Sequence, residues 1–328
     1  LFWLGRFGDH SNSSFADEVV LTLCRLTPEP QVEVHCHGGR EVIAWLQQIL
    51  EAHGVSFCSW EDFESPVPDN RFKSAAEIAL ANAPTLRTAG ILLDQMNGAL
   101  AKALALIRAA WQRSDADEAG RLIQELARYT ALGRHLISPW RVAILGAPNV
   151  GKSSLVNALA GYQRCIVAPT LGTTRDVVTT LSALDGWPVE LADTAGMRDR
   201  AEALEKQGID LAKTTGREAD LCLWIVDASQ QPIWPSQDWI NVRLIINKID
   251  LAPVWNLSQA GEAIRVSAQT GTGIPTLCLN VARWLVPDPP SPGAAVPFTP
   301  ELARKLEEAK RFHDAGKFPD ALHILGGI

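Results

Sequence analysis

The motif Gly-Ala-Pro-Asn-Val-Gly-Lys-Ser, at residues 146–153, constrains the fold of this chain more than any other feature. Such a loop wraps a polyphosphate when a strand leads into it and a helix leaves it, because backbone N–H groups and the helix N-terminus then converge on the phosphates. The apolar run 142–145 precedes the motif, and residues 153–160 have helical composition. We expect Gly161 to end that helix as its C′ residue. The sequence therefore predicts a phosphate-binding loop between a strand and a helix.

The residue types in this loop suit a nucleotide. Gly146 and Gly151 permit backbone angles and a close approach that a β-carbon would prevent. Lys152 can reach the β- and γ-phosphates and assist catalysis, and Ser153 can ligate Mg²⁺. The residues of this segment that we expect to contact the nucleotide are Asn149, Val150, Gly151, Lys152, Ser153 and Ser154.

Two later motifs match the parts of a nucleotide-dependent switch. In Gly172-Thr173-Thr174-Arg175-Asp176, a threonine can fold over the γ-phosphate and Mg²⁺. We assign this catalytic and metal-binding role to Thr174, with Thr173 as the other candidate. In Asp193-Thr194-Ala195-Gly196, Asp193 can hold Mg²⁺ through water, and the N–H of Gly196 can sense the γ-phosphate.

Two further motifs predict specificity for guanine. In Asn247-Lys248-Ile249-Asp250, Asp250 can accept hydrogen bonds from N1–H and the exocyclic amine of guanine, a donor pair that adenine lacks. Ser267-Ala268 would then pack beside the base. One such motif alone could be a turn or a helix cap. All five in order, each at the C-terminal end of a predicted strand, predict a GTPase of the P-loop class.

Strands and helices alternate over residues 139–288, which predicts an α/β domain with a doubly wound, mainly parallel sheet covered on both faces. A turn at 184–187 predicts an antiparallel hairpin between the second and third strands. Only about 14 residues join two predicted strands between Asp227 and Val242, and a full crossover helix barely fits in such a connection. The predicted strands span 141–145, 177–183, 189–192, 221–226, 243–246 and 264–266.

Three other segments flank this GTPase domain. Residues 1–70 predict a small α+β segment, with strands at 19–23 and 32–35 and a helix at 40–53. Residues 71–138 predict a helical segment with breaks at Pro84 and at 114–115. Residues 289–328 predict a linker and a C-terminal helical region made of one helix at 300–315 and a short tail. The proline-rich stretch 287–293 spans the boundary between the GTPase domain and this linker.

The composition narrows the partners. The formal net charge of −7, without a basic block, argues against broad nucleic-acid binding but leaves a local RNA contact open. No apolar run approaches the roughly 18 residues needed to cross a membrane. The six scattered cysteines are typical of buried thiols in a reducing cytoplasm, so we expect a cytoplasmic protein. For His35-Cys36-His37, a structural role is favoured over a metal site.

The residue after Gly196 raises a catalytic question. Many GTPases place a water-orienting glutamine there, but this chain has Met197, which cannot orient water. Arg175 lies near the predicted phosphate site and could be an arginine finger or a surface residue. Either hydrolysis is very slow, or another side chain and a cation supply the missing stabilisation.

The motifs together resemble those of the bacterial tRNA-modification GTPase family, MnmE (TrmE). The resemblance rests on 146–161, on Gly-Thr-Thr-Arg-Asp-Val and Asp-Thr-Ala-Gly-Met-Arg, and on Val32–Gly39, which resembles a signature of the family's folate-binding N-terminal domain. It implies that a K⁺ ion held partly by Asn149 replaces an arginine finger and that G-domain dimerisation completes the site. It also implies that Glu205, otherwise a solvated helix residue, positions water. GTP hydrolysis to GDP and phosphate would then serve wobble-uridine modification, with tRNA or an FAD-dependent modification protein as partners.

The chain also departs from this family. It ends in His323-Ile324-Leu325-Gly326-Gly327-Ile328, without the family's Cys-x-Gly-Lys motif, and its N-terminal segment is expected to lack the opening strands. These departures leave folate binding open, with its absence favoured, and we expect weak or no rescue of tRNA modification. The alternative function is a regulatory GTP-dependent switch or binding module that no longer modifies tRNA.

Overall fold

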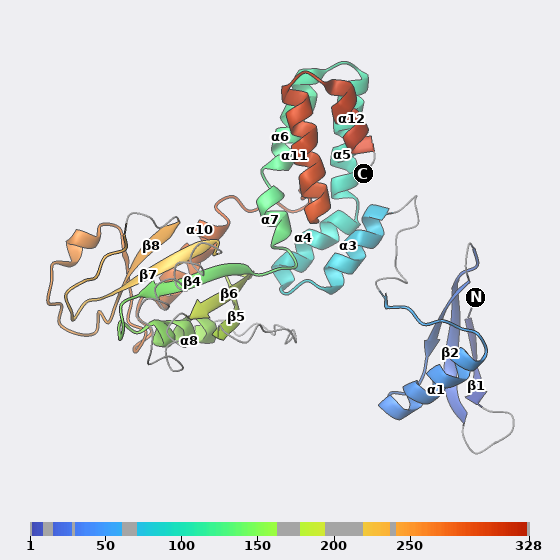
Figure 1. The fold of residues 1–328 in the computed structure, drawn as a ribbon, viewed down its shortest axis with the longest axis horizontal. Helices are drawn as coiled ribbons and strands as arrows, with labels where there is room; N and C mark the ends of the chain where they lie inside the picture. The colour runs from blue at the N-terminus through green and yellow to red at the C-terminus, as the bar shows by residue number, and fades with distance from the viewer. Residues whose placement is uncertain are drawn as a thin grey trace. The chain divides into compact units, whose positions relative to one another are not determined.

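The computed structural model describes residues 2–8, 16–27, 30–60, 71–162, 178–193, 219–236 and 241–326. The chain divides into two compact units, Leu1–Val67 and Pro68–Ile328, whose elements are labelled in Figure 1. Within the described ranges no single helix has the length and hydropathy of a membrane span. One pair of helices, Leu86–Met96 and Ala99–Gln112, meets both criteria together by length and composition alone, and it is bent by 47°.

The first unit contains a three-stranded antiparallel sheet in the order β1-β2-β3, followed by helix α1. β1 pairs with β2 along its whole length, although no strand was predicted for residues 2–8. The sequence signal was weak because most of this strand is exposed and its apolar residues do not alternate with polar ones. The bounds are β1 Phe2–Gly8, β2 Ala16–Arg25, β3 Gln31–His35 and α1 Arg40–Ala52.

Seven helices of the second unit's described part form a helical region. The break at Pro84 is followed by a capping box, in which Thr85 and Thr88 exchange side-chain to backbone hydrogen bonds at the start of α4. The second break has Ser114 in the left-handed region, with φ 61°, and Asp115 as the N-cap of α6. The helices are α3 Arg71–Ala81, α4 Leu86–Met96, α5 Ala99–Gln112, α6 Ala116–Ala127, α7 Thr130–Arg134, α11 Pro300–Asp314 and α12 Phe318–Gly326.

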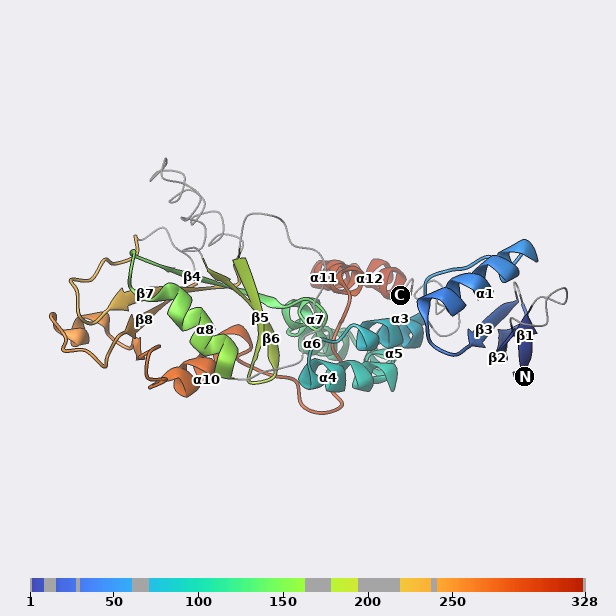
Figure 2. The ribbon, with the colours of Figure 1, turned by 90° about the horizontal axis from the view of Figure 1, so that it is seen from below.

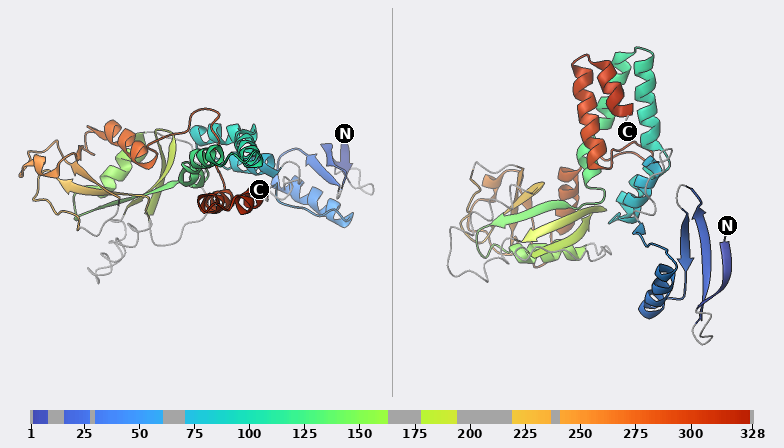
Figure 3. Two further views of the ribbon diagram at one scale, coloured as in Figure 1. Left: turned by 90° about the horizontal axis from the view of Figure 1, so that it is seen from above. Right: turned by 45° about the vertical axis from the view of Figure 1, so that its right-hand side comes forward.

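The two C-terminal helices return to the earlier ones. α11 packs on α6 and α7, and α12 packs on α5, as Figures 1 and 3 show. Residues 318–326 were expected to be a tail, but Ala321 and Leu325 are fully buried and hold α12 in place. These two residues are one helical turn apart, so they lie on the same face of the helix and bury it against its neighbours.

The proline-rich stretch 287–293 leads into a segment that is anchored on α4. The amide of Gln95, itself buried, donates to the carbonyl of Ala294 at 3.0 Å and accepts from the N–H of Val296 at 3.0 Å. Val296 and Phe298 are almost completely buried. The end of this connection is therefore part of the packed helical region.

The rest of the second unit is built on a six-stranded sheet in the order β5-β6-β4-β7-β8-β9. β5 is antiparallel to β6 and all other neighbours are parallel, which confirms the predicted α/β fold with a mainly parallel sheet. The described part of 228–236 contains no helix, as the short connection predicted. The strands are β4 Trp140–Gly146, β5 Val178–Leu184, β6 Trp187–Asp193, β7 Leu221–Asp227, β8 Val242–Asn247 and β9 Ile264–Arg265.

Helices α8 (Lys152–Tyr162) and α10 (Ile274–Leu285) contact each other and lie on one side of the sheet (Figure 2). Side chains of β4 alternate between the faces: Val142 and Ile144 join the main core, and Ala143 and Leu145 join a smaller cluster. A short 3-10 turn, Leu257–Ala260, precedes β9.

The turn between β5 and β6 confirms the predicted hairpin. Asp185 and Gly186 both have positive φ, 49° and 79°, as a two-residue hairpin turn requires. This turn contacts the helical region, because Thr85 donates its hydroxyl to the carbonyl of Gly186 at 2.7 Å and Arg87 pairs with Asp185 at 2.9 Å.

Candidate functional site

The phosphate-binding loop leaves the end of β4 and enters α8. Gly146 and Gly151 have φ of 138° and 94°. A β-carbon at Gly146 would strike the carbonyl of Ile225, and one at Gly151 would strike the side chain of Asn247. Both positions therefore require glycine for backbone conformation and for space.

Helix α8 begins at Lys152 and continues through Gly161 to Tyr162. The prediction that Gly161 is the C′ residue was wrong, because this glycine has no left-handed φ and lies inside the helix. Ser153 and Ser154 are exposed on the first turn, where helix N–H groups are available to an anion.

The side chain of Lys152 is folded over the loop. Its ammonium donates to the carbonyls of Gly146 at 3.2 Å and Ala147 at 2.8 Å, and the residue is only 7% exposed. A buried ammonium beside the loop backbone attracts phosphate oxygens strongly, because low exposure to water weakens the screening of its charge.

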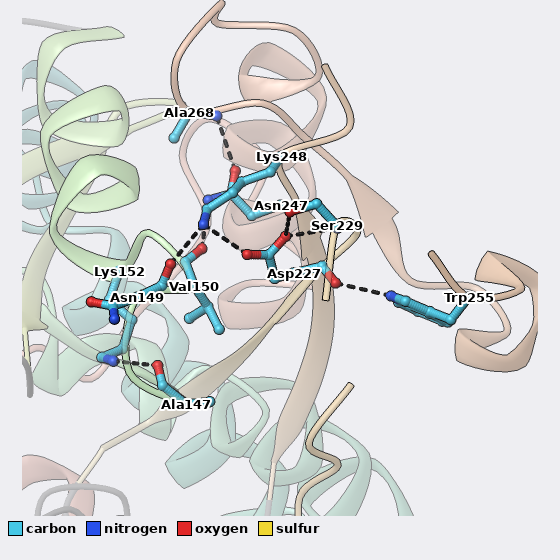
Figure 4. A network of polar contacts seen from close by, with 10 residues as sticks. All are labelled: Ala147, Asn149, Val150, Lys152, Asp227, Ser229, Asn247, Lys248, Trp255 and Ala268. Carbon is cyan, nitrogen blue, oxygen red and sulfur yellow. Dashed lines mark hydrogen bonds and ion pairs between the residues drawn. The ribbon is translucent and has the colours of Figure 1, made fainter. Parts of the chain in front are cut away.

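Asn247, at the end of β8, joins two loops of the site (Figure 4). Its amide donates to the carbonyl of Val150 at 2.9 Å, and its oxygen accepts from the N–H of Ala268 at 3.0 Å. It is 1% exposed, so its role in the described part of the site is to fix backbone. The phosphate loop and the segment after β9 are thereby tied to one side chain.

Lys248 makes the second link between the same motif and the phosphate loop. Its ammonium donates to the carbonyl of Asn149 at 2.7 Å and forms an ion pair with Asp227, also at 2.7 Å (Figure 4). Asn149 and Lys248 both occupy the left-handed region, with φ of 62° and 61°. That conformation is unfavourable for residues other than glycine, so tertiary contacts must hold it.

Asp227 was not predicted as a site residue. It ends β7 beside Asn247 of β8 and is 3% exposed. One carboxylate oxygen accepts from the N–H and hydroxyl of Ser229, at 2.8 and 2.7 Å, and its carbonyl accepts from the indole of Trp255 at 2.9 Å. Burial raises the pKa of this carboxyl, but the hydrogen bonds and charge of Lys248 and Ser229 outweigh burial and hold the pKa below its ordinary value. Its place at the C-terminal end of a predicted strand was the available signal.

The other predicted residues lie at the same edge of the sheet. Asp193 ends β6, is 6% exposed and pairs in register with Ile144 of β4. Ser267 is fully buried, and its hydroxyl accepts from the N–H of Thr270 at 3.1 Å, which shapes the turn that carries Ala268. Asp250 is exposed, and no described residue donates a hydrogen bond to its carboxylate.

Several predicted residues lie outside the described residues: Thr173, Thr174, Arg175, Gly196, Met197 and Glu205. Within the described ranges, no group of three or more His, Cys, Asp or Glu is placed to hold a metal ion. In the first unit, the Asp17 carboxylate accepts hydrogen bonds from the backbone N–H of His37 at 3.0 Å and from its Nδ1 at 2.9 Å. The Mg²⁺ expected here would rely on Ser153, Asp193 and phosphate oxygens, a set of hard oxygen donors that suits this ion.

The phosphate loop lies at the C-terminal edge of a mainly parallel sheet, and two residues of an Asn-Lys-x-Asp motif hydrogen-bond to its backbone. This combination defines a P-loop GTPase. The family model for 50S ribosome-binding GTPases matches residues 141–256. The chain is 32% identical over 307 residues to the tRNA modification GTPase MnmE of Thermus thermophilus, which covers 84% of this chain and 70% of that protein. The chain belongs to the MnmE family and is a GTP hydrolase.

Two further similarities cover different shares of the chain. The MnmE of Phenylobacterium zucineum is 35% identical over 261 residues, covering 70% of this chain and 58% of that protein. A solved structure, the G domain of the T. maritima FeoB iron transporter, covers 44% of this chain and 98% of its own, at 23% identity and a TM-score of 0.32.

Proposed function

We propose that this chain hydrolyses GTP to GDP and phosphate with the assistance of K⁺, and that Asn149 is a ligand of that ion. This proposal rests on the conformation of Asn149. The residue is exposed, its φ is 62°, and its carbonyl accepts a hydrogen bond from Lys248. The fixed backbone leaves the side-chain amide oxygen, a hard ligand, at the rim of the phosphate loop. A cation there offsets charge that develops between the phosphates during hydrolysis.

The described residues fit GTP and Mg²⁺. Gly146 and Gly151 let the phosphate loop pack directly against Ile225 and Asn247, and two carbonyls of the same loop hold the Lys152 ammonium. Ser153 and Asp193 would hold Mg²⁺, which supplies charge neutralisation to the phosphates when bound. We propose Thr174, or Thr173 in its place, as a further Mg²⁺ ligand, the N–H of Gly196 as a γ-phosphate contact, and Glu205 as the residue that positions water.

We propose Asp250 as the guanine-selective residue. Its carboxylate is exposed beside Lys248 and has no described donor, so it can accept from the two donors on the guanine edge. Asn247 supports it indirectly, by fixing the backbone of Ala268 and therefore the segment Ser267-Ala268 that would pack beside the base.

The test is GTP turnover by the purified chain in K⁺ and in Na⁺ buffer of equal ionic strength. We expect faster turnover in K⁺, and loss of that difference in Asn149→Ala. Equal rates in the two buffers would contradict the K⁺ proposal. Glu205→Ala should lose most turnover while GDP affinity stays nearly unchanged, and wild-type turnover in this variant would remove Glu205 from the mechanism.

We also propose that hydrolysis serves tRNA modification through G-domain dimers, because the curated relatives are named tRNA modification GTPases. Wobble-uridine modification in a strain that lacks its own family member, measured with and without this chain, tests the proposal. Restored modification supports the proposal and would overturn the expectation of weak or no rescue, and unmodified tRNA in cells that contain the folded chain opposes the proposal. We also propose that the chain is organised into the four segments predicted from its sequence, residues 1–70, 71–138, 139–288 and 289–328.

A further inference from the structure

We propose that Asp227 is a positioning residue for nucleotide binding, and that it acts through Lys248 on the backbone of the phosphate loop. The inference rests on the proposed guanine-nucleotide site. Asp227 itself ends β7 and reaches that loop only through the Lys248 ammonium.

The contacts define a chain of three groups. The Asp227 carboxylate is 2.7 Å from the Lys248 ammonium, which donates to the Asn149 carbonyl at 2.7 Å. The side chain of Asp227 is 2% exposed, whereas that of Lys248 is 28% exposed. A lysine with access to water turns outward unless a buried opposite charge retains its ammonium. Asp227 provides that charge.

The carboxylate is itself held in one orientation. Ser229 donates two hydrogen bonds to Oδ1, which leaves Oδ2 for Lys248. The backbone of Asp227 is fixed by its register with Asn247 and by the indole of Trp255. These contacts fix the position of the ion pair, so that the Lys248 ammonium lies beside the backbone carbonyl of Asn149 in the phosphate loop (Figure 4).

The consequence concerns two neighbouring loop carbonyls. Asn247 holds that of Val150, and Lys248 holds that of Asn149. Without Asp227 the first anchor remains and the second is released. Asn149 then loses the contact that opposes its unfavourable φ, so the N–H groups that follow lose their fixed direction toward the phosphates.

The experiment is release of mant-GDP from the full chain, followed by stopped-flow fluorescence. Asp227→Asn keeps the shape and an acceptor for Ser229 but removes the charge. We expect dissociation to accelerate about tenfold, because loss of one partner of a buried charge pair acts mainly on the off-rate. In a Lys248→Met background the same substitution should change the rate by less than about twofold, since the group through which it acts is gone.

The matched control lies at the other end of the same strand. Asp220 precedes Leu221, the first residue of β7, and accepts from the N–H of Arg141 at 2.7 Å, away from the phosphate loop. Asp220→Asn should leave mant-GDP release unchanged. If Asp227→Asn alone does not fold, Lys248→Met by itself should accelerate mant-GDP release about tenfold, and an unchanged rate in that variant would overturn the inference.

An unchanged off-rate in Asp227→Asn, or the same acceleration in the wild-type and Lys248→Met backgrounds, would overturn the inference. A wild-type chain that does not bind mant-GDP would instead contradict the proposed function, and the inference would fall with it. The two failures are thus distinguished by the first measurement on the unmodified chain.

Discussion

Arg87 of α4 and Asp185 of the β5–β6 turn form an ion pair, with Nη1 2.9 Å from Oδ2. The Arg87 guanidinium also lies over the ring of Trp187, 4.9 Å from its centroid. The same turn accepts a hydrogen bond from Thr85 at 2.7 Å. The helical region therefore contacts one end of the β5–β6 hairpin. The other end of this hairpin carries Asp193, which is predicted to hold Mg²⁺ through water.

Replacing Arg87 with Ala should destabilise this contact. Both side chains of the ion pair are more than one-third exposed, so we expect a loss of only about 1 kcal/mol, shared between the ion pair and the cation–π contact. The free energy of unfolding from urea titration checks this. Arg121→Ala, which breaks ion pairs within α6 alone, is the control and should change stability by less than about 0.5 kcal/mol. Equal losses in the two variants would contradict the role of the turn.

Two helical glycines should respond in opposite ways to Ala. A β-carbon on Gly133 of α7 would strike the backbone carbonyl of Pro297, whereas one on Gly161 of α8 meets no atom of the described residues within 4 Å. We expect Gly133→Ala to cost several kcal/mol, about 3 or more, because backbone cannot yield as a side chain can. Gly161→Ala should gain about 0.5–1 kcal/mol from helix propensity. Thermal unfolding of both variants measures the difference, and a shift of the same sign would refute the packing argument.

The strands and phosphate motifs could be predicted because their signals are local. Apolar runs such as Leu221–Asp227 reveal strands by themselves, and Asp-Gly at 185–186 specifies its own turn. Motif order then placed Lys152 and Asn247 at one edge of the sheet, since parallel strands share that edge.

The parts that could not be predicted depend on distant contacts. No sequence motif marks Asp227 as a site residue. It belongs to the site because the Lys248 side chain forms an ion pair with it. Helix α12 packs on α11 and also on α5, which lies far earlier in the chain. β1 depends on its pairing with β2 more than on its own apolar pattern.

His135 should make stability depend on pH. Its ring stacks on Trp140, with centroids 3.6 Å apart, and Asp220 lies 3.7 Å from Nε2. Burial lowers the pKa of His135 below its ordinary value, although Asp220 favours the charged form. The unfolded chain then takes up a proton at higher pH than the folded chain. The stabilisation is thus complete above the ordinary pKa of about 6.5 and is lost as the pH falls through the folded-state value.

The measurement is the free energy of unfolding at several pH values between 8 and the onset of acid unfolding, for wild type and His135→Phe. The phenyl ring retains an aromatic stack on Trp140 but does not titrate. We expect wild type to lose stability faster than the variant as the pH falls. Parallel pH profiles would show that His135 does not titrate differently in the two states.

Asp250→Asn should change which base the site selects. The carboxylate accepts two hydrogen bonds from guanine, whereas an amide presents a donor that opposes one of them and suits the 2-carbonyl of xanthine. Two lost charge-assisted hydrogen bonds correspond to at least about 100-fold weaker GDP binding. Competition of GDP and XDP against a fluorescent nucleotide measures both affinities. Asp314→Asn, an exposed change on α11 beside Lys310, should leave both unchanged. Retained GDP affinity in Asp250→Asn would show that guanine is recognised elsewhere, because the exposed carboxylate has no described partner that could otherwise explain its placement.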